Sequence, residues 1–113
     1  MDARLGPWNL GEWAGRPLRD LDLLAWRTDP AFAGHGGESL LALSDRVRLL
    51  LTDWHRRPGR LAAVTHAPVI KLAVVQALRA PVQAVWDLDV APGSTTELHS
   101  TPSGWRVTAV SCR

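Results

Sequence analysis

The sequence contains a single cysteine, no tyrosine and no long apolar run, and each absence excludes a class of protein. One thiol, Cys112, cannot form an internal disulfide, and without a second cysteine or a His-x-x-x-His pair the sequence predicts no metal site. Uncharged stretches such as residues 72–78 are far shorter than the about 20 residues that span a bilayer, and the N-terminus lacks the apolar core of a signal peptide. We therefore predict a soluble, cytoplasmic protein with no membrane partner, metal or cofactor.

The charge balance does not indicate a nucleic-acid-binding surface. The formal net charge is only +2, and the pI near 9.5 overstates the basicity because few groups titrate between neutral and high pH. The basic residues 55–57 lack a second basic stripe or interleaved aromatics, so they fit a solvated helix end better than a nucleic-acid patch. The 46% hydrophobic and 21% charged content is typical of one globular domain, which we assign to residues 1–113.

The first half of the chain predicts a loop followed by helices. Residues 1–17 contain glycines and prolines between tryptophans, a pattern that favours an ordered loop, and residues 18–27 allow one or two short helical turns. Residues 38–56 carry apolar side chains at three- and four-residue steps and predict a long helix. Glu38 then falls in the first turn, where a carboxylate complements the helix dipole.

The second half of the chain predicts strands as well as helices. Residues 60–65 have the apolar character of a buried strand, and residues 68–79 predict a largely buried helix. A strand that leads into a buried helix implies a parallel sheet. A further helical turn over residues 81–86 is followed by a hairpin formed by residues 94–99 and 105–110.

The most informative feature is a histidine between the predicted strand and the buried helix. His66 precedes a helix start, where unpaired N–H groups and the positive end of the dipole attract an anion. Its imidazole can donate a hydrogen bond to a phosphoryl oxygen and stabilise charge during transfer. Because Pro68 has no N–H, the predicted phosphate-binding residues are His66 and Ala67. The alternative is a structural histidine that satisfies a hydrogen bond in the core.

Three segments, taken in order, carry a resemblance to one enzyme family. The first is Arg-Leu at residues 4–5 followed by Gly-Glu-Trp-Ala-Gly-Arg at residues 11–16. The second is Gly-Glu-Ser at residues 37–39, which opens a long helix that contains Arg46. The third is Val-Thr-His at residues 64–66 before a buried helix. Together they resemble the histidine phosphatase superfamily, also called phosphoglycerate mutase-like.

The resemblance implies both a fold and a reaction. The fold is α/β, a three-layer αβα arrangement of the phosphoglycerate mutase type, with a mostly parallel sheet and a C-terminal hairpin. Family members transfer the phosphoryl group of a phosphomonoester to a histidine in an Arg-His-Gly motif, and water or another acceptor then releases it. The implied partner is a small phosphorylated molecule or phosphate. His66 corresponds to the second active-site histidine of the family, so the resemblance favours its phosphate-binding role.

Two departures from the family pattern bear on activity. None of the histidines is preceded by arginine and followed by glycine, so the nucleophile is missing. The family acid, four residues before the first glycine of Gly-x-Trp-x-Gly, falls on Pro7, which can neither give nor take a proton. Glu38 or Glu12 could replace it, although Glu38 is also explained as a partner of the helix dipole. We name His66 and Glu38 as catalytic candidates.

These departures predict an N-terminally truncated or degenerate domain that is inactive alone. The family's first strand would lie beside the strand that ends at His66, so its loss would expose one edge of residues 60–65. An exposed apolar edge predicts self-association. The alternative function is a non-catalytic module that binds phosphate or a partner.

Overall fold

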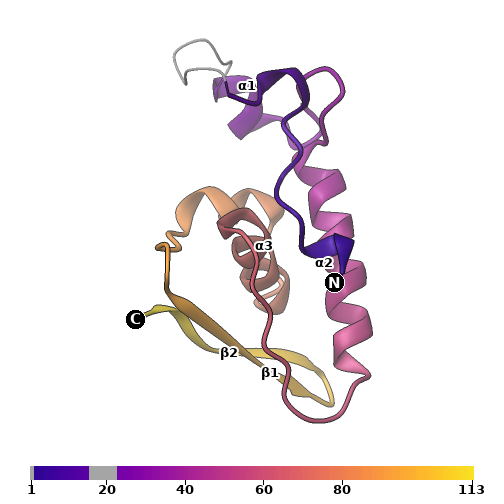
Figure 1. Ribbon diagram of the computed structural model, residues 1–113, viewed down its shortest axis with the longest axis vertical. Helices are drawn as coiled ribbons and strands as arrows, with labels where there is room; N and C mark the ends of the chain where they lie inside the picture. Colours follow the sequence, from indigo (N-terminus) through magenta and orange to yellow (C-terminus); the bar gives the residue numbers. More distant parts are fainter. Residues whose placement is uncertain (1, 16–22) are drawn as a thin grey trace.

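The computed structural model of the 113-residue chain describes residues 2–15 and 23–113 (Figure 1). The part of the predicted helical turns at residues 18–22 therefore lies outside the described residues. In chain order the elements are the 3-10 turns η1 (Ala3–Leu5) and η2 (Gly11–Trp13), the helices α1 (Leu23–Thr28), α2 (Leu40–His55) and α3 (Ala67–Ala77), the 3-10 segment η4 (Val82–Asp87), and the strands β1 (Thr95–Thr101) and β2 (Gly104–Cys112). The α/β class is thus confirmed.

Helix α2 forms the predicted long helix, but it begins later than expected. Ser39 is the N-cap, with extended backbone, and its side-chain oxygen accepts a hydrogen bond from the Ala42 N–H at 3.1 Å. Glu38 therefore precedes the cap, and its predicted place in the first turn is wrong. The buried side chains recur at helical spacing along one face, so packing and capping agree on where the helix lies. They are Leu40, Leu43, Val47, Leu50 and Leu51.

Helix α3 confirms the prediction of a largely buried helix after His66, although it spans Ala67–Ala77 instead of residues 68–79. His66 is the N-cap, and Pro68 occupies the second helical position, where a missing N–H breaks no intrahelical hydrogen bond. The helix packs against α2, η4 and the hairpin, so most of its circumference is covered. Its buried residues are Val69, Leu72, Val74 and Val75. Together with the α2 face and Val85 of η4, they are the buried hydrophobic residues of the described chain.

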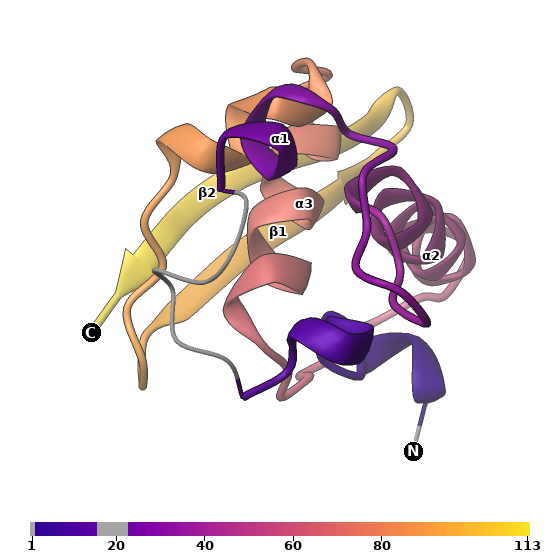
Figure 2. The ribbon, with the colours of Figure 1, turned by 90° about the horizontal axis from the view of Figure 1, so that it is seen from above.

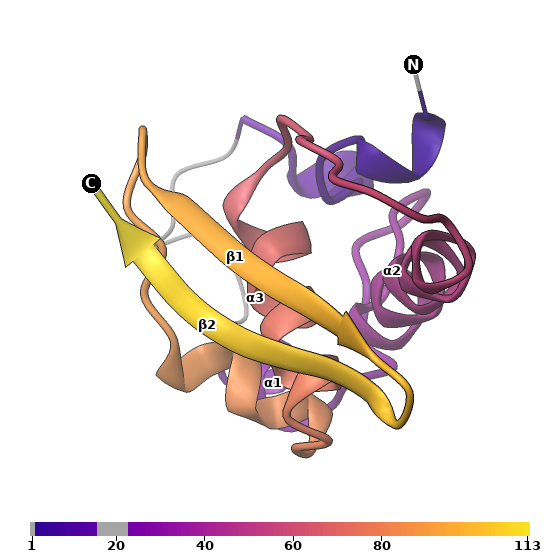
Figure 3. The ribbon, with the colours of Figure 1, turned by 90° about the horizontal axis from the view of Figure 1, so that it is seen from below.

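The sheet differs from the expectation. Within residues 2–15 and 23–113 it consists of β1 and β2 alone, an antiparallel hairpin that lies across α3 (Figure 3). The hairpin was predicted, whereas the mostly parallel sheet is wrong for this part of the chain. No described helix is long and apolar enough to cross a membrane.

The prediction of a buried strand over residues 60–65 is also wrong. These residues form no backbone hydrogen bond with any described residue, and the side chains of Leu61 and Val64 are 57% and 96% exposed. A strand exists only where a neighbour supplies N–H and C=O groups along its edge. The N-terminal residues 3–5, which lie beside the end of this segment, form the 3-10 turn η1 instead. We refer to residues 60–65 as the unpaired segment.

Candidate functional site

The N-terminal segment lies beside the start of α3 (Figure 2), and residues of both line a cavity of about 280 Å³. His66 lines it from the helix side, and Gly6 and Pro7 line it from the N-terminal side. Pro7 occupies the position at which the family pattern places an acid. The structure therefore brings the predicted histidine and that position to one cavity, although they are far apart in the sequence. The complete lining is Asp2, Ala3, Leu5, Gly6, Pro7, Val64 and His66.

The start of α3 leaves donors free beside this cavity. The side chain of His66 makes no capping hydrogen bond and is exposed. The N–H of Ile70 donates to the His66 carbonyl at 3.1 Å, whereas the N–H groups of Ala67 and Val69 have no partner among the described residues. An anion at this helix end would be stabilised by these N–H groups, by the dipole and by the imidazole.

Glu38 does not line this cavity. Its Oε1 accepts hydrogen bonds from Arg46 Nη2 at 2.7 Å and from the Asn9 N–H at 2.9 Å, and its side chain is only 19% exposed. The second acid considered as a replacement, Glu12, is exposed and joins the neighbouring loop through its N–H, which donates to the His35 carbonyl at 3.0 Å. In this structure Glu38 thus serves to hold the N-terminal segment, and its catalytic role stays a prediction.

Arg46 is the site-forming residue that sequence reasoning missed. From the middle of α2, its guanidinium donates to the carbonyls of Arg4 and Gly6, both at 2.8 Å, and of Pro7 at 3.1 Å. The same group pairs with Glu38. Arg46 therefore fixes the backbone of the N-terminal segment where it forms a wall of the cavity. The only sequence signal was an arginine within a segment that resembles the family.

Gly11 explains why the first glycine of Gly-x-Trp-x-Gly is required. Its φ of +58° is rarely adopted by residues with a side chain, and a Cβ at this position would overlap the backbone nitrogen of Gly37. The close approach lets the Glu38 N–H donate to the Asn9 carbonyl at 2.8 Å. The loop before α2 and the N-terminal segment consequently support each other.

Asp2 brings negative charge to the cavity. The Arg4 side chain, followed by the Arg4 backbone N–H, donates hydrogen bonds to this carboxylate and lowers the pKa of Asp2 to about 2. Arg4 also pairs with Asp53 at 2.6 Å, and both bonds raise the pKa of the guanidinium. Asp2 is the one carboxylate in the described lining of the cavity, and its negative charge opposes an anion there.

The ion pair between Asp2 and Arg4 predicts that the stability of the N-terminal segment depends weakly on pH in acid. Because the folded-state pKa is below the ordinary value of 3.8, the carboxylate stabilises the fold above that value. This stabilisation is lost as the pH falls through about 2. Carboxyl-carbon NMR should give Asp2 a midpoint near 2, and Asp2→Asn should remove this part of the pH dependence. A midpoint at 3.8 would show that the pair with Arg4 does not persist in solution.

The profile of the histidine phosphatase superfamily (branch 1) matches residues 1–113. The chain belongs to this family. Its sequence is 35% identical over 86 residues to a glucosyl-3-phosphoglycerate phosphatase of Mycolicibacterium vanbaalenii, which covers 65% of this chain and 36% of the relative. A protein of the same name from Mycobacterium tuberculosis is 37% identical over 59 residues, 47% of this chain and 26% of the relative.

Solved structures agree with this assignment. A mycobacterial glucosyl-3-phosphoglycerate phosphatase in complex with VO3 superposes with a TM-score of 0.78 and 27% identity, over 99% of this chain and 64% of that chain. The alpha-ribazole phosphatase of Shigella flexneri superposes with a TM-score of 0.77 at 21% identity, over 98% of this chain and 59% of that one, and shows the shared fold. The 113 residues therefore span less than two thirds of these relatives.

Proposed function

We propose that the cavity at His66 is the part of a phosphatase site that contains the family's second active-site histidine. It binds the phosphate group of a small phosphomonoester but does not turn the substrate over alone. The observation that carries the proposal is the cavity that His66 and Pro7 line together. The imidazole and the N–H groups of Ala67 and Val69 supply the donors that a phosphate needs.

The absence of two catalytic groups supports the proposal that the site does not turn its ligand over alone. In the family, a histidine of an Arg-His-Gly motif attacks phosphorus, and an acid protonates the leaving group. These 113 residues contain no such motif, and Pro7 occupies the position of the acid. His66 can hold and polarise a phosphoryl group, but the described cavity holds no second histidine, and its one carboxyl group, Asp2, stays ionised because Arg4 lowers its pKa to about 2.

A non-catalytic phosphate- or partner-binding module is the second candidate. Pro7 favours it, because a cavity that keeps the histidine and lacks the acid can bind an anion but cannot protonate a leaving alkoxide. The names of the relatives support glucosyl-3-phosphoglycerate as the first phosphomonoester to test.

Phosphate binding near His66 is expected to be weak and to depend on the imidazole. In an NMR titration with inorganic phosphate, the His66 imidazole signals should shift in the millimolar range, and His66→Ala should weaken binding about fivefold. Asp2→Asn should tighten binding about twofold, because it removes a negative charge from the cavity wall.

His99→Ala is the matched control, since this histidine is exposed on β1 and pairs with Glu97 at 2.8 Å. It should leave phosphate binding unchanged. An absence of His66 shifts at about 10 mM phosphate would instead support a purely structural histidine. Turnover is measured in parallel with glucosyl-3-phosphoglycerate. We expect none above background, and hydrolysis that His66→Ala abolishes would show that His66 carries the chemistry itself.

A further inference from the structure

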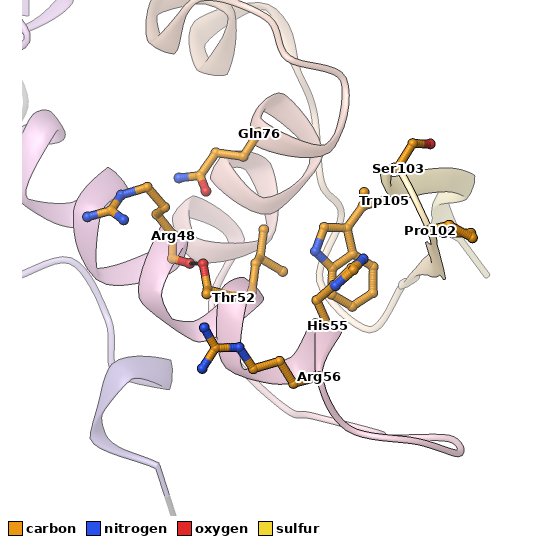
Figure 4. A pocket seen from close by; sticks show the side chains of 10 residues that line it. Arg48, Thr52, His55, Arg56, Gln76, Pro102, Ser103 and Trp105 are labelled. Carbon is orange, nitrogen blue, oxygen red and sulfur yellow. Dashed lines mark hydrogen bonds between the residues drawn. The ribbon is translucent and has the colours of Figure 1, made fainter.

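A second and larger cavity, of about 490 Å³, opens between the end of α2, α3 and the turn of the hairpin (Figure 4). It shares no lining residue with the cavity at His66. Its volume lies within the about 300 to 1,000 Å³ that is typical of small-molecule sites. The phosphatase chemistry leaves this cavity unused.

One side of the cavity is an aromatic wall. The rings of His55 and Trp105 meet edge to face, with centroids 5.7 Å apart and an interplanar angle of 74°. His55 Nε2 lies 2.7 Å from the Thr101 carbonyl, which can only accept, so this nitrogen donates and the ring is held in place. Trp105 is held in place because it packs against the core. A flat apolar ligand would find a fixed surface here.

Two arginines bring positive charge to the cavity. Arg48 and Arg56 extend from the same side of α2 and line the cavity with Thr52 between them (Figure 4). Arg48 approaches Asp45 at 3.7 Å, but both side chains are more than half exposed, so this pair is weak. Arg56 forms no ion pair within the described part of the chain, and the lining contains no carboxylate. The cavity therefore favours an anion.

We propose that this cavity binds a small organic anion with a flat apolar ring. The ring contacts Trp105 and His55, and the anionic group accepts hydrogen bonds from Arg48 and Arg56. Guanidinium groups suit a carboxylate because their paired N–H groups match its two oxygens. The proposal is independent of phosphate binding at His66.

The test uses the 113-residue protein and 1-naphthoate, which joins a flat ring to a carboxylate. Ligand-observed NMR should give saturable binding, and replacing both arginines, Arg48→Gln with Arg56→Gln, should weaken it about fivefold or more. The matched control, Arg106→Gln with Arg113→Gln, removes the same charge from exposed residues outside the cavity and should change little. His66→Ala should also leave the affinity unchanged. 1-Naphthalenemethanol, the uncharged analogue, should bind about fivefold more weakly than the carboxylate.

Three results would overturn the proposal. The first is no binding of 1-naphthoate at about 5 mM. The second is an equal loss of affinity in the two double variants, which would indicate attraction by net charge alone. The third is a loss in His66→Ala, which would place the ligand in the other cavity. Because all four arginines are exposed or lie outside the core, these variants are expected to fold.

Discussion

Replacing Arg46 with alanine is expected to lower the free energy of unfolding by about 3 kcal/mol and to release the N-terminal segment. The Arg46 side chain is only 20% exposed, and its guanidinium donates to the carbonyls of Arg4, Gly6 and Pro7 and pairs with Glu38. Its removal leaves these acceptors unpaired and the Glu38 carboxylate without a counter-charge. Chemical denaturation followed by tryptophan fluorescence measures the loss.

Matched substitutions separate this role from a general effect of charge. Arg46→Lys keeps the charge but not the fork of donors, so an intermediate loss of about 1 to 2 kcal/mol is expected. Arg48→Ala removes an exposed arginine from the same helix and should cost less than about 0.5 kcal/mol. Equal losses in Arg46→Ala and Arg48→Ala would show that the contacts with the N-terminal carbonyls do not stabilise the fold.

The Arg46 contacts also show where sequence reasoning ends. The helix that carries Arg46 was predictable, because its apolar spacing and the Ser39 cap are local signals. Its partners were not, since the Arg4 carbonyl lies 42 residues away in the sequence and a carbonyl acceptor has no side-chain signature. Glu38 shows the same limit. The resemblance placed this residue near the site, but the groups that its carboxylate contacts depend on the fold and could not be predicted.

The strands illustrate the same limit. The hairpin of β1 and β2 was predictable because the turn residues Pro102 and Ser103 join two segments that pair with each other. The unpaired segment is more apolar than β1, but a strand also requires a neighbour, and the residues of the segment carry no information about one. His66 was predictable to the extent that the helix start is a local feature. The place of Pro7 at the site could be predicted only from the resemblance, which assigns an acid to that position.

The unpaired segment leads to the second large prediction, because it combines two features that favour association. Its backbone N–H and C=O groups have no backbone partner among the described residues, and it exposes apolar side chains at Leu61 and Val64. Thr65 Oγ1 donates to the Leu5 carbonyl at 2.6 Å, which holds one end of the segment in place. Residues 61–65 of the segment carry no charge, and an apolar edge that is anchored in this way is a template for pairing with another chain.

We expect the protein to self-associate through the unpaired segment. Light scattering across a concentration series should show a mass that rises above the monomer, and thermal unfolding should shift to higher temperature as the concentration increases. Replacing both exposed apolar residues, Leu61→Lys with Val64→Lys, should restore the monomer, since lysines along an edge oppose strand pairing. The core should tolerate these changes because both side chains are exposed.

The control places one lysine elsewhere on the surface. Leu49 on α2 is 50% exposed, so Leu49→Lys removes an exposed leucine without altering the unpaired segment, and association should persist. If Leu49→Lys abolished association and the double variant did not, the contact would lie on the helix. A monomer at every concentration, with a cooperative and concentration-independent transition, would contradict the prediction outright. It would mean that solvation of the unpaired backbone and its apolar side chains costs less than the entropy lost when two chains pair.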